Sequence, residues 1–193
     1  MTTKPEDGMD ADTMDGRLKA LTFEAMDDAQ RAAAERMLAS KTGRIIGPMN
    51  AWLRCPPLAL RAVELGDYAR HGSTHEKRIS ELVIIMVARH WSAQVEWCVH
   101  KVEALKAGLA PAIVDAIEAR RRPVFDKPDE ALVYDLFTEL LDTRQVSDET
   151  YARASDLFGE SKLVELIAIF GHYNHAATVL NTFRVPVPPG WAE

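Results

Sequence analysis

The sequence predicts an all-α fold, because apolar residues recur at steps of three and four positions and no stretch alternates convincingly with a period of two. This pattern extends from about Leu21 to about Leu180, and glycine and proline residues divide it into segments of helical length. Residues 1–21 lack a sustained apolar period and hold few anchoring groups. We therefore expect a flexible N-terminal tail over residues 1–21 and a single helical domain over residues 22–193.

The composition is that of an ordinary globular domain with an acidic surface. Hydrophobic residues make up 47% of the 193 positions and charged residues 27%, so the chain can build a sizeable core. The 23 Lys and Arg residues are outnumbered by 29 Asp and Glu residues, which gives a net charge of −6. Because nucleic acids and anionic membranes would be repelled by most of this surface, we expect neither as a partner.

Compartment and redox state follow from three features. The longest apolar run, Leu82 to Ala88, is too short to span a bilayer, and the N-terminal segment is acidic rather than a basic segment leading into an apolar one. These features predict a cytoplasmic protein. Cys55 and Cys98 do not form a C-x-x-C pair and cannot make a disulfide framework, so we expect reduced thiols.

The first half of the chain shows four predicted helices. One covers residues 27–41 and ends at Gly43, and the next begins at Pro56-Pro57 and ends at Gly72. Ser73 to Glu76 resembles a capping box, which predicts a third helix from about Thr74 that is apolar around most of its circumference. A fourth covers residues 93–107. The buried stripe of the second helix is predicted at Leu58, Ala62, Leu65 and Ala69.

The second half predicts four more helices, over residues 111–120, 129–143, 147–158 and 161–180. Asp129, Ser147 and Ser161 have the side chains expected of N-terminal caps. The prolines between Val185 and Pro189 predict an extended end.

Glu81 is the first candidate for chemistry, because it lies within the most apolar run of the sequence. Burying an ionised carboxylate is unfavourable unless it is paired. Arg78, three positions away on the same side of a helix, could form a structural ion pair with it. Alternatively, Glu81 faces a desolvated cavity with a raised pKa, as a general acid or base requires.

Glu96 and His100 are the expected partners of Glu81. They are four positions apart, so they share one face of a helix and the carboxylate can orient the imidazole. Val95, Trp97 and Val99 indicate that this helix is largely packed. Cys98 lies about 200° around the helix from either residue and is expected to be a structural thiol.

The residues from Arg78 to His100, RISELVIIMVARHWSAQVEWCVH, resemble the signature of the carboxymuconolactone decarboxylase family within the alkylhydroperoxidase-D-like superfamily. The likeness continues through KVEALKAGL and extends to GPMNAWLRCPPLA before it and LVELIAIFGHYNHAATVLNTFRVPVP near the C-terminus. It implies an alkylhydroperoxidase-D-like helical bundle that forms a homo-oligomer, commonly a trimer or hexamer. In the peroxidase branch, two cysteines occupy the positions of Ala93 and Glu96. Both are absent here, so the resemblance favours the decarboxylase branch and disfavours thiol peroxidase activity.

The resemblance implies a carboxy-lyase of aromatic compound catabolism that removes carbon dioxide from a small lactone of the 4-carboxymuconolactone type without a cofactor. Protonated His100 would be the acid, Glu96 would orient it, and Glu81 would be a relay or a second, neutral acid. An anionic substrate also needs a binding group. The candidates for this binding group are Arg78, Arg89, Arg54, Arg44 and His172. Of these, His172 could face the same cavity as His100.

Three alternatives remain open. The same acid/base residues could serve a hydrolase, hydratase or isomerase acting on another small organic acid. The spacings of His71 with His75 and of His172 with His175 would allow a metal-dependent enzyme, although the first pair spans the Gly72 break and we expect no metal. Finally, the apolar helices could make the chain a non-catalytic oligomeric binding module.

Overall fold

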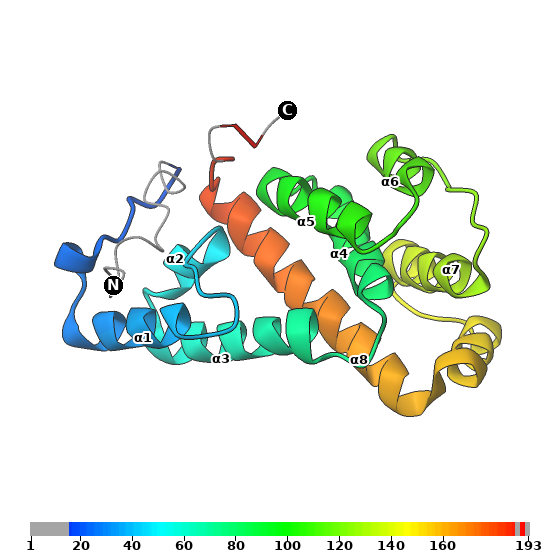
Figure 1. The fold of residues 1–193 in the computed structure, drawn as a ribbon, viewed down its shortest axis with the longest axis horizontal. Coiled ribbons are helices and arrows are strands. Elements are labelled where there is room, and N and C mark those ends of the chain that lie inside the picture. The colour runs from blue at the N-terminus through cyan, green and yellow to red at the C-terminus, as the bar shows by residue number, and fades with distance from the viewer. Residues whose placement is uncertain (1–15, 188–189, 192–193) are drawn as a thin grey trace.

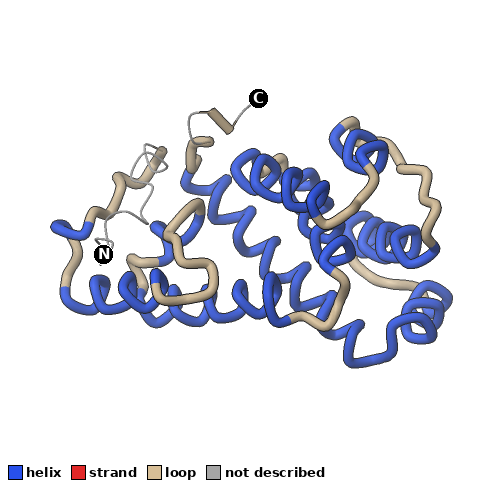
Figure 2. Tube along the Cα trace, in the orientation of Figure 1, coloured by secondary structure: helices blue, strands red, loops and turns tan. Residues whose placement is uncertain are grey.

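The computed structural model describes residues 16–187 and 190–191, and this part of the chain consists of helices and connecting loops, without a strand (Figures 1 and 2). The all-α prediction is therefore confirmed. Most of the predicted tail, residues 1–15, lies outside the described residues. The helices, in chain order, are α1 (Asp28–Leu38), α2 (Pro48–Trp52), α3 (Pro56–Asp67), α4 (Lys77–Trp91), α5 (Gln94–Lys106), α6 (Pro111–Glu118), α7 (Pro128–Thr143) and α8 (Asp148–Phe183). A 3₁₀ turn, Phe23–Ala25, precedes α1, and a π-helical turn, Tyr68–Gly72, follows α3.

The centre of the fold is α4, which packs against α5, α7 and α8. Every residue from Arg78 to Ala88 is buried, so this helix has almost no solvent-facing side until its last turn. The main apolar core is formed by α4 together with Leu136 and Phe137 of α7 and Leu166 and Ile169 of α8. The most apolar run of the sequence is thus buried in α4, whereas the apolar run of α8 is buried on one side only, since Val164 and Ile167 are 68% and 43% exposed.

A second apolar cluster forms where α1, α2 and α3 pack together and meet α8. Its largest members include Met37, Trp52 and Leu53, and Ala176 of α8 joins it. Figure 1 shows α8 crossing the molecule between the α1–α3 layer and the α4–α5 pair. The helix α8 therefore contributes to both clusters. The cavity of the candidate site lies between the two clusters, beside the C-terminal half of α8.

The predicted helix boundaries differ from the structure in two places. Ser73 does not cap α4; instead, Glu165 of α8 accepts hydrogen bonds from the Ser73 hydroxyl and the Thr74 amide at 3.1 and 2.9 Å, and α4 begins at Lys77. The short helix α2 was not predicted. The last two predicted helices are present as the two segments of α8, which the non-helical Gly159, with φ at 74°, separates.

The predicted buried stripe of α3 is half wrong. Ala62 and Ala69 are buried, but Leu58 and Leu65 are exposed, because α3 turns its small residues towards α1 and α8. Ala59 and Gly66 lie on the packed side instead. The close approach of α8 requires this arrangement, since larger side chains would hold the helices apart.

The segment before Leu21 is attached to the fold from Arg17 onwards. The Arg17 amide donates to the Phe183 carbonyl at 2.8 Å, and the Leu21 amide donates to Asn50 Oδ1 at 3.1 Å. Residues 17–21, which the sequence analysis assigned to the tail, are therefore attached to the fold. Among the described helices, none combines the length and the apolar character that a membrane crossing requires.

Candidate active site

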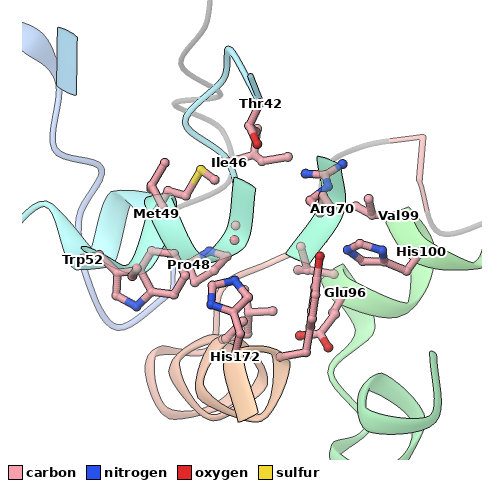
Figure 3. A pocket seen from close by; sticks show the side chains of 18 of the residues that line it. Thr42, Ile46, Pro48, Met49, Trp52, Arg70, Glu96, Val99, His100 and His172 are labelled. Atoms are coloured by element: carbon pink, nitrogen blue, oxygen red, sulfur yellow. The ribbon is translucent and has the colours of Figure 1, made fainter. Parts of the chain in front are cut away.

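The inner cavity lies between α3, α5 and α8 and is covered by the loop that precedes α2 (Figure 3). It has a volume of about 80 Å³. Most of its wall is apolar, and a few polar side chains enter it from three elements. The polar lining residues are Thr42, Arg70, Glu96, His100, His172 and Tyr173.

Glu81 and His100 form a buried pair at the base of this site. Oε2 of Glu81 lies 2.7 Å from Nδ1 of His100, and the side chains are 0% and 6% exposed. The other carboxylate oxygen, Oε1, lies 2.8 Å from Nζ of Lys77. Burial alone would raise the pKa of Glu81, but His100 and Lys77 outweigh it and lower the pKa to about 2.

The ionised state of Glu81 fixes the tautomer of His100. A carboxylate can only accept a hydrogen bond, so Nδ1 of His100 carries the hydrogen. Nε2 is then the ring nitrogen that can exchange a proton with a molecule in the inner cavity, which His100 lines. This arrangement makes the imidazole a base when neutral and an acid when protonated.

The tight turn between α4 and α5 brings the two residues together. Ser92 ends α4 in the left-handed conformation, with φ at 51°, and α5 begins two positions later. The two helices pack along each other over most of the length of α5. Residues nineteen positions apart therefore meet across the helix pair.

Glu96 lines the inner cavity, and its state differs from the one expected. It is 4% exposed, and neither carboxylate oxygen has a hydrogen-bond partner among the described residues. Burial raises its pKa well above the usual range. The sequence predicted that Glu96 orients His100 and that Glu81 is a relay or a second, neutral acid. In the structure it is Glu81 that contacts His100, and Glu96 is the carboxyl group whose pKa burial raises.

Arg70 was not predicted, and it supplies a cation to the cavity (Figure 3). It lies in the π-helical turn that follows α3, and its Nε is buried without a hydrogen-bond partner in the described part of the chain. The sequence does not predict this position, because Gly72 indicates a helix end, whereas the direction of the Arg70 side chain depends on the extra residue in the π-helical turn. A guanidinium with an unused donor in a cavity is suited to bind a carboxylate.

His172 lines the same cavity from α8, as expected. Burial lowers its pKa to about 4, and the nearby His175, His100 and Arg70 add to this effect. Its ring packs against Trp52, with ring centroids 6.0 Å apart. His172 is therefore a neutral side chain at neutral pH. Among the described residues, no group of three or more His, Cys, Asp or Glu side chains could hold a metal ion.

The predicted arginines lie elsewhere. Arg78 forms ion pairs with Glu130 of α7 at 2.9 Å and with Glu76 at 3.1 Å. It therefore does not pair with Glu81, and it does not line the inner cavity. Arg89 donates to the Glu118 carbonyl and Arg54 to the Asn50 carbonyl, and neither lines the inner cavity. Arg44 lines the adjoining outer cavity described below.

The two cysteines are not placed for dithiol chemistry in the inner cavity. Cys55 is exposed at the start of α3 and Cys98 is half-buried on α5, and both are free thiols. Neither lines the inner cavity. Ala93, at one of the positions that hold cysteine in the peroxidase branch, is fully buried in the core.

An outer cavity of about 580 Å³ adjoins the inner one over the outward side of α5. The two cavities share Thr42, Ile46, Arg70, Val99 and Trp191. The shared residues make one continuous cleft, with Arg70 at the junction.

Comparison with solved structures identifies the fold. The chain superposes on the crystal structure of the alkylhydroperoxidase AhpD core of an uncharacterized peroxidase-related protein from Ralstonia eutropha, with a TM-score of 0.70 and 12% identity over 92% of this chain and 94% of that one. The chain has an AhpD-like fold. A protein of unknown function from Agrobacterium tumefaciens, described as a candidate antioxidant defence protein AhpD, matches with a TM-score of 0.60 and 18% identity over 74% of this chain and 99% of that one.

These likenesses confirm the predicted AhpD-like helical bundle. At 12% and 18% sequence identity, these likenesses show the fold and do not indicate a shared reaction. No family model matches the sequence, and no curated protein matches it. The chemistry of this protein therefore depends on the residues of its own cavity.

Proposed function

We propose that this protein is an acid/base enzyme that decarboxylates a small carboxylated lactone of the 4-carboxymuconolactone type, without thiol chemistry and without a cofactor. One observation carries the proposal. The ionised Glu81 holds His100 at a cavity that also contains the unpartnered carboxyl group of Glu96 and the guanidinium of Arg70. This set can bind an anion, stabilise developing charge and deliver a proton.

His100 is the proton donor in this proposal. When the carbon–carbon bond to the leaving carboxylate breaks, carbon dioxide departs and the electron pair spreads into the unsaturated lactone. The Nε2 hydrogen of protonated His100 then passes to carbon, and solvent later restores it. Glu81, with its pKa near 2, stays ionised at neutral pH and stabilises the imidazolium until that transfer.

Glu96 and Arg70 have separate tasks in the same step. Burial raises the pKa of Glu96 and so favours its protonated form, whose hydroxyl can donate a hydrogen bond to the lactone carbonyl oxygen on which negative charge develops. Arg70 would bind a carboxylate that does not react, at the junction of the two cavities. The reacting carboxylate would then lie against the apolar wall, where loss of its charge is favoured.

A hydroperoxide reductase is the second candidate, because one structural neighbour is named as peroxidase-related. That reaction needs one thiolate to attack and a second thiol to resolve the product. Cys98 and Cys55 lie outside the inner cavity, so they would have to act at another place. Alternatives that use the same acid/base residues are hydrolysis, hydration or isomerisation of a related acid.

The test is turnover of a panel of carboxylated unsaturated lactones, followed by loss of lactone absorbance and by released carbon dioxide. We expect the wild-type protein and the C55S/C98S variant to be equally active. We expect His100→Gln to lose at least about 100-fold in kcat, because general acid catalysis contributes a factor of about that size or more.

The same proteins are assayed with tert-butyl hydroperoxide and a dithiol reductant. Peroxide turnover that C55S/C98S abolishes, with no lactone turnover, would replace the decarboxylase proposal with the thiol one. Full lactone turnover in His100→Gln would remove His100 from the mechanism.

A further inference from the structure

The two adjoining cavities differ in size and in lining. The inner cavity has a volume of about 80 Å³. One water molecule needs roughly 10–15 Å³ of such volume, so the inner cavity can hold about one small ring. The outer cavity, about 580 Å³, is far larger. A substrate no larger than a simple lactone would leave the outer cavity unused.

The charged side chains at the outer cavity largely pair with one another. Nζ of Lys101 lies 2.9 Å from Glu118, and Nζ of Lys106 lies 2.9 Å from Glu103. Arg70 differs from these lysines, because its buried Nε has no hydrogen-bond partner among the described residues. The site for an anion is therefore the junction rather than the outer rim.

Apolar side chains also remain uncovered in the outer cavity. Val102 and Leu105 of α5 are 48% and 39% exposed, although both are large aliphatic residues. Trp97 also lines this cavity, but it is buried in the core. An apolar group bound here would cover Val102 and Leu105 and remove apolar area from water.

We propose that the ligand is an organic acid whose carboxylate binds Arg70 between two arms, a reacting arm in the inner cavity and an apolar arm in the outer cavity along Val102 and Leu105. The statement about the reacting arm rests on the proposed function, whereas the binding geometry does not. The protein carries a net charge of −6, so a specific cation at the junction is needed to hold an anion in this cleft.

The binding geometry is tested with three unreactive probes and isothermal titration calorimetry on the full chain. Phenylacetate has one arm, diphenylacetate has two arms on the carbon that bears the carboxylate, and 2,2-diphenylethanol has two arms and no charge. We expect diphenylacetate to bind at least about tenfold more tightly than either of the others, because only it fills both cavities and pairs with Arg70.

Variants separate the two contributions. Arg70→Gln should weaken both acids by about tenfold and leave the alcohol unchanged. Val102→Asp should weaken diphenylacetate and leave phenylacetate unchanged. Arg61→Gln and Leu58→Asp are matched controls, because both residues are exposed and line neither cavity, and they should change nothing.

Equal affinities for the two acids, absence of binding by either acid, or acid binding that survives Arg70→Gln would overturn the inference. Its failure is distinguishable from failure of the proposed function. If the three probes bind with the expected affinities but no lactone is turned over, the two-armed binding site is supported and the decarboxylase proposal is wrong. If lactones are turned over but the probes do not bind with the expected affinities, the decarboxylase proposal is supported and the two-armed site is wrong.

Discussion

Glu81 and His100 contact each other at 2.7 Å inside the protein, although nineteen positions separate them and they belong to different helices. The contact joins α4 to α5 and fixes which nitrogen of His100 faces the inner cavity. It also explains why an ionised carboxylate is tolerated in the most apolar helix of the fold. His100 and Lys77 together compensate for its loss of hydration.

Replacing Glu81 with Gln should destabilise the protein in a pH-dependent way. The pKa of Glu81 falls from its usual 4.5 to about 2 in the folded state, which corresponds to about 3 kcal/mol. Because the unfolded chain binds this proton more tightly, the stabilisation is present above pH 4.5 and is lost as the pH falls towards 2. Urea unfolding of the wild type and Glu81→Gln at pH 7 and pH 3 measures this; an equal difference at both values would contradict the ion pair.

Replacing Glu96 with Gln should have the opposite pH dependence. Burial raises the pKa of Glu96 in the folded state, so the folded chain binds this proton more tightly than the unfolded chain. Its favourable contribution is complete below the usual pKa and is lost as the pH rises through the folded-state value. Glu96→Gln, which cannot ionise, should therefore gain thermal stability relative to wild type as the pH rises above the usual pKa of 4.5.

The control for that measurement is Glu160→Gln, a change at an exposed carboxylate of α8. Its stability relative to wild type should not vary over the same range. A parallel response of the two variants would show that Glu96 is ionised at neutral pH in the folded protein.

Lys77 should act on the site through Glu81 and Arg70. Its Nζ lies 2.8 Å from Glu81 Oε1 and donates to the Arg70 carbonyl at 3.2 Å. Lys77→Met should raise the pKa of Glu81, so lactone turnover should fall about tenfold and fall further at pH 5 than at pH 8. Lys77→Arg should restore the pH profile. Lys162→Met, at an exposed position of α8, is the control, and a similar loss there would make the Lys77 effect non-specific.

Gly66 should tolerate no side chain, because a Cβ there would lie 2.9 Å from Nε2 of His172. Gly66→Ala should displace the His172 ring from Trp52, destabilise the protein by about 1–3 kcal/mol and reduce turnover. Gly171→Ala, on α8, meets nothing within 4 Å and should be neutral or slightly stabilising. Thermal unfolding of the two variants provides the comparison, and equal melting temperatures would contradict the close packing at Gly66.

Much of the fold could be predicted, because local signals set the helix ends. Asp27 caps α1, Pro56 begins α3, and Ser147 caps α8. The exposure of Leu58 and Leu65 could not be predicted, since the side of α3 that is buried depends on how closely α8 approaches it. The helix α2 was missed because five residues are too few to show a helical period.

The candidate site was predicted in part for the same reason. The spacing of Glu96 and His100 placed both on one face of α5, and both line the inner cavity. Which glutamate pairs with His100 depends on how α4 crosses α5, and no local pattern encodes that. The position of Arg70 depends on a π-helical turn. Arg78 pairs with Asp129 and Glu130 of α7, which lie fifty-one and fifty-two positions away in the sequence.

We infer that His100 exchanges a proton through Nε2 while its Nδ1–H donates a hydrogen bond to ionised Glu81. Nitrogen-15 NMR of histidine-labelled protein at pH 8, with His100→Gln used to assign the signal, shows which ring nitrogen carries the hydrogen. We expect a protonated Nδ1 and an unprotonated Nε2 in the wild type, and loss of this preference in Glu81→Gln. A hydrogen on Nε2 of neutral His100 in the wild type would overturn this inference.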